Sequence, residues 1–271
     1  MLKVLIIGDG NAGAYHRKAY LEADCEIVAQ TGERDDYRRH VRDVDLISIA
    51  SPDRFHFEQC AEAIRARKHI FVEKPPCLRT DELKFLIERT ADINFACNLP
   101  LPWAPDFVEV RKQLEAGACG KIYLIEAEYN YGRKSKLMDG WRASADYSMV
   151  FGAGLHMVDL MLWYMGAAPS DGMAFGVTTT KAKVDTVQAI MRFPGGAIGR
   201  LGINGGYEGR HYHRLDIYGD KMGIKCETAG EIDKTVPIKE FVKMCLAGQK
   251  VDNARLWQAM RVCFQIEEEM P

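Results

Sequence analysis

Apolar and polar positions in the first hundred residues alternate between short apolar runs and amphipathic stretches. Lys3–Ile7 is an apolar run that stops at Gly8, as expected of a parallel strand covered on both faces. From Phe57 onward apolar side chains recur at helical spacing, which predicts a helix over 57–67 leading into a strand over 70–72. The same pattern predicts a helix over 14–23 and strands over 26–29, 44–50 and 93–97. This alternation predicts a parallel sheet built from βαβ units.

One more helix is predicted to begin near residue 80. Thr80 has the side chain of an N-cap, and Asp81 and Glu82 place negative charge where the helix start is positive. Leu83 and Leu86 then begin a buried stripe.

The second half of the chain has a different rhythm. Three prolines precede it and predict a domain boundary, at Pro100, Pro102 and Pro105. Successive strands are then predicted over 121–131, 173–180, 184–193, 197–203, 215–218 and 223–227. Because residues 187–193 alternate cleanly and a Pro-Gly-Gly turn follows, this sheet is predicted to be largely antiparallel with one buried face. Helices over 155–165, 238–246 and 254–268 are expected to cover that face.

Composition narrows the class of protein. The 271 residues are 47% hydrophobic and 27% charged, and Lys+Arg 36 against Asp+Glu 38 gives no basic field for nucleic acid. No apolar run reaches membrane-spanning length. The eight cysteines show no Cys-x-x-Cys pair and no zinc spacing. We therefore expect a cytoplasmic protein with reduced thiols, no metal site, and no nucleic-acid or membrane partner.

A glycine fingerprint follows the first strand and opens the first helix. It reads G-x-G-x-x-G over Gly8, Asp9, Gly10, Asn11, Ala12 and Gly13. Glycines permit the tight turn and close backbone approach, and the helix N-terminus offers N–H groups to a pyrophosphate. The alternative is a glycine-rich turn without a nucleotide. We expect NAD or NADP to bind here, within a Rossmann domain over residues 1–98, followed by an α+β substrate-binding and oligomerisation domain over 99–271 whose C-terminal helix can pack back on the first.

The residue that closes the second strand normally selects between the two cofactors. An acid there bonds the ribose hydroxyls of NAD, whereas a neutral residue followed by arginine suits a 2′-phosphate. Gly32 stands at that place and is followed by Glu33 and Arg34. Glu33 favours NAD and Arg34 favours NADP, so the choice stays open; both are also compatible with a solvated loop.

Glu73-Lys74-Pro75 follows the predicted strand 70–72. Proline restricts Lys74 to extended geometry, and the Lys74–Pro75 bond itself is a candidate for the cis form. A lysine at the carboxyl end of a parallel strand points into the crevice where such sheets bind ligands. Partial desolvation, or a positive nicotinamide nearby, would favour its neutral amine and let it move a proton. The alternative is an ordinary solvated loop lysine.

His156 begins the predicted helix over 155–165, three residues before Asp159. A carboxylate at that spacing can orient the imidazole for proton transfer or for bonding a substrate hydroxyl. The alternative is a histidine satisfied at a helix start, with Asp159 as its structural partner.

The sequence motifs, taken in their order along the chain, resemble those of the Gfo/Idh/MocA oxidoreductase family. This family is named after glucose-fructose oxidoreductase, inositol dehydrogenase and rhizopine catabolism. The resemblance runs through nearly the whole chain. Its marks are Gly8 to Gly13 with His16, Ala50-Ser51-Pro52 with His56, Glu73-Lys74-Pro75, Asn98, Gly120-Lys121-Ile122, Trp141-Arg142, and His156 to Asp159 with Trp163 and Gly166.

The resemblance implies a Rossmann domain followed by a domain with an open sheet that often makes subunit contacts, here in a dimer or tetramer. It implies that Lys74 is catalytic and that His156 is catalytic or binds substrate, and it favours Trp141 and Arg142 as substrate residues. The residues implied to border the nicotinamide and its ribose are Ser51, Pro52, His56, Glu73, Pro75 and Asn98. The substrate class is a sugar, cyclitol or nucleotide-linked sugar.

Three departures from the family pattern bear on catalysis. Gly152 stands where the family often has an aspartate four residues before the histidine, and Asp146-Tyr147-Ser148 replaces a glycine-rich stretch. The chain is also shorter than most relatives.

From the motifs and the resemblance together, we expect an NAD(P)-dependent oxidoreductase that interconverts a secondary alcohol and a ketone, with Lys74 assisted by His156. The alternatives are a cofactor-binding regulator or degenerate member without turnover, and an NAD-dependent glycosidase.

Two polar clusters of the second half are candidates for substrate contact. One joins aromatic and basic residues at Tyr129, Tyr131, Arg133, Lys134, Lys136, Trp141 and Arg142, and the other is His211, Tyr212, His213 and Arg214. Aromatic faces suit a sugar ring, and the basic groups suit an anion. The alternative is that these are strand residues and a solvated loop.

Overall fold

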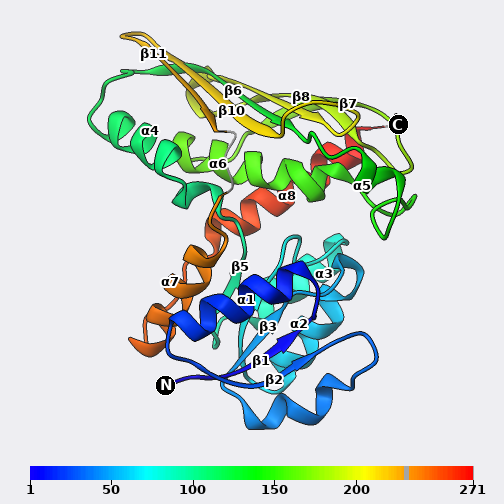
Figure 1. The fold of residues 1–271 in the computed structure, drawn as a ribbon. Coiled ribbons are helices and arrows are strands. Elements are labelled where there is room, and N and C mark those ends of the chain that lie inside the picture. Colours follow the sequence, from blue (N-terminus) through cyan, green and yellow to red (C-terminus); the bar gives the residue numbers. More distant parts are fainter. Residues whose placement is uncertain (229–231, 271) are drawn as a thin grey trace. The chain divides into compact units, whose positions relative to one another are not determined.

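The computed structural model describes residues 1–228 and 232–270, and the chain divides into two compact units (Figure 1). The first unit comprises Met1–Pro100 and Asp233–Trp257, and the second comprises Leu101–Ile232 and Gln258–Pro271. The predicted boundary near residue 98 lies beside the division at Pro100. Residues 233–257, predicted in the second domain, are counted with the first unit.

A five-stranded parallel sheet forms the first unit, in the order β2-β1-β3-β4-β5. Its strands are β1 Lys3–Ile7, β2 Glu26–Thr31, β3 Leu46–Ile49, β4 His69–Val72 and β5 Phe95–Cys97. β1 and β3 are buried throughout apart from Lys3, as their apolar runs predict. Chain order changes direction between β1 and β3, and ligands of open α/β sheets bind outside the carboxyl ends at such a point.

The helices of this unit are amphipathic. They are α1 Asn11–Glu22, α2 His56–Arg65, α3 Thr80–Arg89 and α7 Thr235–Leu246, with 3₁₀ turns over Tyr37–Asp43 and Asp53–Phe55. The N-cap prediction for Thr80 is wrong, because the cap position is Arg79 and Thr80 is already helical. Glu82 reaches back to accept a hydrogen bond from the Leu78 amide (3.0 Å), which ties the first turn of α3 to the residue before its cap position.

Helix α7 packs in the first unit, which corrects the expectation that it covers the antiparallel sheet. Ile238, Phe241 and Val242 are buried in one cluster with Val4, Ile6, Ala19, Tyr20, Leu46 and Phe71. The rings of Phe71 and Phe241 lie 5.5 Å apart. The apolar stripe of α7 was read correctly, but a stripe does not say which sheet it meets.

A six-stranded sheet forms the second unit, in the order β11-β10-β6-β9-β8-β7. Its strands are β6 Ile122–Asn130, β7 Asp171–Val177, β8 Thr186–Arg192, β9 Ile198–Asn204, β10 Tyr212–Gly219 and β11 Gly223–Thr228. The pair β6–β9 is parallel and the other neighbours are antiparallel. Alternation along β8 buries Val187, Ala189 and Met191 and exposes the residues between them. The prediction of a largely antiparallel sheet with one buried face is confirmed.

Helices line the buried face of this sheet (Figure 1). They are α4 Pro105–Glu115, α5 Ser135–Met138, α6 Leu155–Met165 and α8 Ala254–Glu269, with 3₁₀ turns over Leu101–Trp103 and Pro194–Gly196 and a π-helical turn over Val150–Gly154. Helix α6 has the predicted bounds and ends at Gly166, whose φ of 67° is left-handed. Over residues 1–228 and 232–270 no helix has both the length and the apolarity that a membrane crossing needs.

Candidate functional site

The carboxyl ends of the five parallel strands are aligned by one row of four backbone hydrogen bonds. Gly8 donates to Thr31 (2.8 Å), Ala50 to Ile7 (2.7 Å), Glu73 to Ile49 (2.8 Å) and Asn98 to Val72 (2.8 Å). The glycine turn, Ser51, Lys74 and Asn98 therefore leave the sheet at the same edge. This is where an open α/β sheet binds its ligand.

Two of the fingerprint glycines are required by the protein itself. Gly8 has φ 123°, and a Cβ there would lie 2.5 Å from the Ala50 carbonyl oxygen. A Cβ on Gly13 would lie 2.8 Å from the carbonyl carbon of Gly8. These glycines let β1, the turn and α1 pack closely.

Gly10 is different, because nothing in the protein requires a glycine there. Its φ of −76° suits any residue, and a Cβ would meet no atom within 4 Å. It is the N-cap of α1, where no side chain caps the helix and no acid occupies the first turn. The free N–H groups and the open space beside them fit the pyrophosphate of a dinucleotide.

Glu73 is the centre of a buried hydrogen-bond network. Its Oε1 accepts from the Tyr15 hydroxyl, from His16 Nε2 (3.1 Å) and from Asn98 Nδ2 (2.7 Å). Behind His16, Tyr20 donates to Ser48 Oγ (2.9 Å), and Ser48 Oγ lies within hydrogen-bond distance of His16 Nδ1 (2.7 Å). The network ties α1, β3, β4 and β5 together directly before Lys74.

The network fixes the charge state of Glu73. Burial by itself would raise the pKa of this carboxyl, but the hydrogen bond and charge of His16, with the bonds from Tyr15 and Asn98, lower the pKa well below its usual range. Burial, followed by the Glu73 charge, raises the pKa of Tyr15 far above its ordinary value. Tyr15 therefore keeps its proton and donates to a carboxylate.

His56 joins the loops that follow β3 and β4. Its Nδ1 lies 2.7 Å from the Pro75 carbonyl oxygen and its Nε2 lies 2.8 Å from that of Ser51. Ser51 Oγ in turn donates to Gln59 Oε1 of α2 (2.7 Å). Pro52 is the N-cap of the 3₁₀ turn that precedes α2. The side chain of His56 thus braces the loop that carries Lys74.

Lys74 itself lies half-buried one residue beyond Glu73, and the Lys74–Pro75 peptide bond is cis. Because Glu73 before it and Pro75 after it are both anchored, the backbone of Lys74 is fixed on two sides. A positioned amine at this edge can take up or release a proton.

The cofactor-selecting positions lie just past β2. The Gly32 amide donates to Asp35 Oδ2 (2.8 Å), and Glu33 and Arg34 are exposed. The Asp9 carboxylate of the glycine turn lies against Gly32. Asn11 and Ala12 begin α1 beside it.

In the second unit, His156 lies within a group of aromatic rings. It stacks on Tyr129 at 6.3 Å and 12°, and Tyr129 meets His213 edge-on at 4.6 Å. His211 lies 5.0 Å from His213 and donates from Nδ1 to the Tyr131 carbonyl (2.6 Å). The structure therefore brings His156 together with members of both sequence-predicted polar clusters. Strand pairing explains this, because β10 sets His213 opposite Tyr129 of β6.

Gly152 lies in the π-helical turn one helical turn before His156, and its missing side chain has a local reason. A Cβ there would clash with the Tyr147 hydroxyl and lie 2.8 Å from the ring carbon that bears it. The two departures from the family pattern, at residues 147 and 152, are thus linked in the structure. Tyr147 puts a phenol where the side chain of residue 152 would stand.

Trp141 and Arg142 extend this arrangement. The Trp141 ring meets Tyr147 edge-on at 5.4 Å, and the Arg142 guanidinium lies 4.1 Å from the Trp141 ring centre. Trp141 keeps 39% of its surface exposed. Contact of this aromatic face and cation with a sugar ring or an anionic group stays a prediction from the sequence.

Two family models match the chain. One, described as an oxidoreductase family with an NAD-binding Rossmann fold, covers residues 31–94, and the other, the GFO/IDH/MocA C-terminal domain, covers residues 107–225. The chain belongs to the Gfo/Idh/MocA oxidoreductase family. The expected fold class is confirmed, and so is a nicotinamide dinucleotide as its cofactor.

Curated relatives of this Gfo/Idh/MocA protein are distant. An uncharacterized oxidoreductase of Synechocystis is 25% identical over 67% of this chain and 54% of its own length. Myo-inositol 2-dehydrogenase of Thermotoga maritima is 22% identical over 85% of this chain and 76% of its own length. The chain thus spans little more than half of the first relative.

The fold of this family member also matches solved structures. A scyllo-inositol dehydrogenase of Lactobacillus casei, solved with NAD(H) and scyllo-inositol, gives a TM-score of 0.83 at 18% identity and covers 100% of this chain and 97% of that one. At this identity the likeness concerns the fold.

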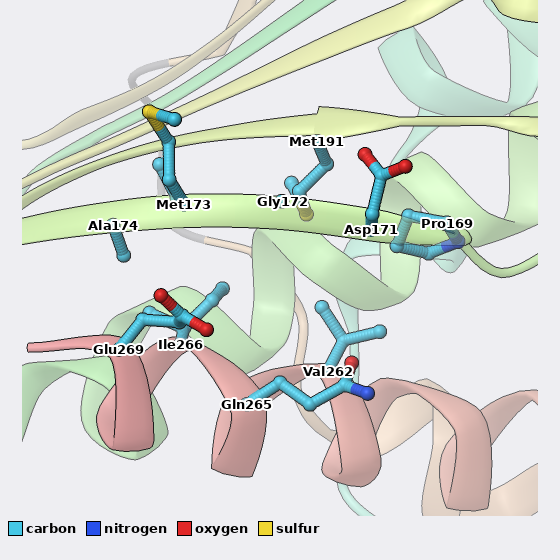
Figure 2. Close-up of a pocket in the computed structure, with 11 residues that line it drawn as sticks. Pro169, Asp171, Gly172, Met173, Ala174, Met191, Val262, Gln265, Ile266 and Glu269 are labelled. Atoms are coloured by element: carbon cyan, nitrogen blue, oxygen red, sulfur yellow. The ribbon is translucent and has the colours of Figure 1, made fainter.

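A separate pocket of the second unit contains none of the predicted site residues. It has a volume of about 200 Å³ and lies between the edge strand β7, its neighbour β8 and helix α8 (Figure 2). Met191, Val262 and Ile266 form its apolar wall, and Asp171, Gln265 and Glu269 its polar rim. The β7 and β8 residues of this lining lie inside the range matched by the C-terminal family model, and those of α8 lie outside it.

Sequence reasoning missed several residues of the site. Tyr15 and His16 bond Glu73, and Ser48 bonds His16, yet only His16 had been noted, as a family mark. Tyr15 and Glu73 are 58 positions apart, so only the packing of α1 on β4 reveals the contact. The available signal was the inward face of α1, on which Gly13, His16 and Tyr20 follow at helical spacing.

Proposed function

We propose that this protein is an NAD(P)-dependent oxidoreductase that interconverts a secondary alcohol and a ketone on a sugar, cyclitol or nucleotide-sugar substrate. Lys74 is the main proton-transfer residue and His156 assists. The observation that carries the proposal is the aligned sheet edge, on which Lys74 leaves the sheet level with the glycine turn. Relatives named as dehydrogenases of sugars and cyclitols support the substrate class.

The protein groups have a defined part in this reaction. When bound, the nicotinamide accepts or returns a hydride at the carbinol carbon. The Lys74 amine takes the hydroxyl proton as the C–O bond becomes C=O, and returns it in the reverse direction. Because Glu73 and Pro75 hold its backbone, the amine needs little reorganisation. Ser51, Pro52, His56, Glu73, Pro75 and Asn98 shape the surroundings of the cofactor.

In the second unit the substrate contacts are proposed to come from His156, Trp141 and Arg142. The stacked face of Tyr129 orients the His156 ring, which leaves it suited to bond a substrate hydroxyl. Trp141 offers an exposed ring face to the apolar side of a sugar ring. The Tyr147 ring, whose hydroxyl lies beside Gly152, packs edge-on against Trp141.

The structure also favours a homo-oligomer. The outward face of the open sheet carries Met173, Phe175 and Val177 of β7 and Ile190 of β8, each more than half exposed. Apolar side chains gathered on one sheet face are typical of an interface. Light scattering tests this, and a monomer at micromolar concentration would contradict it.

A second candidate, a cofactor-binding member without turnover, is favoured by the Tyr147–Gly152 contact, because it removes a carboxylate the family often has. The deciding experiment incubates the protein with NAD⁺ or NADP⁺ and a panel of inositols, glucosides and UDP-linked sugars, and follows reduced nicotinamide. Turnover of any panel member supports the oxidoreductase. Binding without any turnover supports the second candidate, and glycoside hydrolysis without net nicotinamide reduction indicates a glycosidase.

A further inference from the structure

The glycine turn carries a carboxylate that the position after β2 lacks. In dinucleotide-binding domains an acid at the end of the second strand bonds the ribose 2′-hydroxyl. Gly32 occupies that position here and has no side chain to offer. The same edge nevertheless holds a carboxylate from another element.

That carboxylate belongs to Asp9. A Cβ built on Gly32 would clash with Asp9 Oδ2 and lie 2.9 Å from Asp9 Cγ. The side chain of Asp9 therefore fills the space in which a side chain of residue 32 would begin. Because glycine has no Cβ, residue 32 leaves this space to the Asp9 side chain.

Backbone contacts fix Asp9 at the end of β2. Gly8 donates to the Thr31 carbonyl (2.8 Å), and Gln30 Nε2 donates to the Gly8 carbonyl (3.0 Å). Both bonds join the turn before Asp9 to the last residues of β2. These bonds fix the backbone that precedes Asp9, and the exposed Asp9 side chain lies beside Gly32.

We propose that Asp9 takes over the role of the missing acid and makes this protein select NAD(H) over NADP(H). Its carboxylate accepts from the adenosine ribose hydroxyls and repels a 2′-phosphate. This deepens the proposed function, since it rests on the dinucleotide site, but it does not depend on turnover.

Of the neighbouring charges, that of Asp35 also disfavours a 2′-phosphate and that of Arg34 favours one. Asp35 places a second carboxylate at Gly32 but already accepts from the Gly32 amide. Asp9 is exposed and has no hydrogen bond or ion pair with the described residues, so it remains available. Arg34, also exposed, is the cation that would favour NADP(H). Two carboxylates, those of Asp9 and Asp35, thus lie at Gly32, where a 2′-phosphate would add further negative charge.

The test measures dissociation constants of NADH and NADPH by calorimetry for wild type and Asp9→Asn. Wild type is expected to bind NADH at least about tenfold more tightly than NADPH, and Asn, of the same shape, to lose about tenfold in NADH affinity. NADPH binding should stay unchanged or tighten. Gly32→Ala should shift the ratio in the same direction, because its Cβ displaces the flexible Asp9 side chain.

Glu33→Gln tests the rival acid next to Gly32 and should keep the wild-type ratio, whereas Arg34→Gln removes the cation that attracts a 2′-phosphate and should leave the preference for NADH unchanged or raise it. The inference is overturned if wild type binds NADPH as tightly as NADH, if it binds neither, or if Asp9→Asn leaves the ratio unchanged. It is also overturned if Glu33→Gln, rather than Asp9→Asn, removes the preference for NADH. A wild type that prefers NADH through Asp9 but turns over no substrate would refute the oxidoreductase and leave this inference standing.

Discussion

The Tyr147 hydroxyl occupies the space in which a side chain on Gly152 would begin. We predict that Gly152→Ala destabilises the protein by about 1–3 kcal/mol, because the added methyl overpacks a buried turn. In a Tyr147→Ala background the same change should cost much less. Urea unfolding of the four proteins gives the coupling energy. An equal cost in both backgrounds would show that the two residues do not compete for this space.

Alanine substitutions of the fingerprint glycines should separate an effect on stability from an effect on cofactor binding. Gly13→Ala places a methyl against the Gly8 backbone and should lower the unfolding free energy by several kcal/mol, of the order found for severe overpacking. Gly10→Ala should leave stability within about 0.5 kcal/mol, since its Cβ meets nothing and surface changes are usually that small. It should nevertheless weaken NADH binding, because the methyl enters the space proposed for the pyrophosphate.

Thermal melting and NADH titration of the two glycine variants check this pair. Gly10→Ala with unchanged NADH affinity would contradict the placement of the pyrophosphate at the N-terminus of α1. Gly13→Ala with wild-type stability would contradict the close packing of the turn.

Glu73 should make stability fall in acid. Its folded pKa lies below the unfolded value of 4.5, so its contribution is fully present above that pH and is lost as the pH falls toward the folded pKa. Glu73→Gln should cost about 1–3 kcal/mol at neutral pH, because it removes the charged acceptor of Tyr15, His16 and Asn98. The variant should also lose less stability than wild type between neutral and acid pH.

Urea midpoints measured from neutral pH down to about pH 3, which lies below the ordinary range of a carboxyl, test this difference. Asp185, whose buried carboxylate accepts hydrogen bonds from Thr179, Thr180 and Thr186, is present in both proteins. Its contribution to the pH dependence of stability therefore cancels in the comparison. Parallel curves for wild type and Glu73→Gln would mean that the network does not hold a carboxylate.

Local periodicity was enough to locate most elements of the fold. The strand Lys3–Ile7 and the helix Leu155–Met165 have the predicted bounds, because an apolar run closed by Gly8 and a stripe closed by Gly166 are both local signals. The placement of α7 was wrong, because its stripe of Ile238, Phe241 and Val242 would suit either sheet. Only tertiary packing decides between them.

The candidate site could be predicted where a sequence motif directly follows a strand. The glycine fingerprint and Lys74 follow strands directly, so strand ends place them at one edge. Contacts between distant segments were not predictable: Tyr15 with Glu73, and Asp9 with Gly32. Each depends on how a helix or turn packs across the sheet, which spacing along the chain does not encode.

Lys74→Met separates proton transfer from cofactor binding, because methionine keeps the length and most of the volume of the side chain and removes the amine. Turnover of the substrate that wild type accepts should fall by about 10²–10⁴-fold or more, as expected when a general acid–base group is lost. The dissociation constant of NADH, measured on the same preparation, should stay close to the wild-type value. Near wild-type turnover in Lys74→Met would contradict the assignment of proton transfer to this lysine.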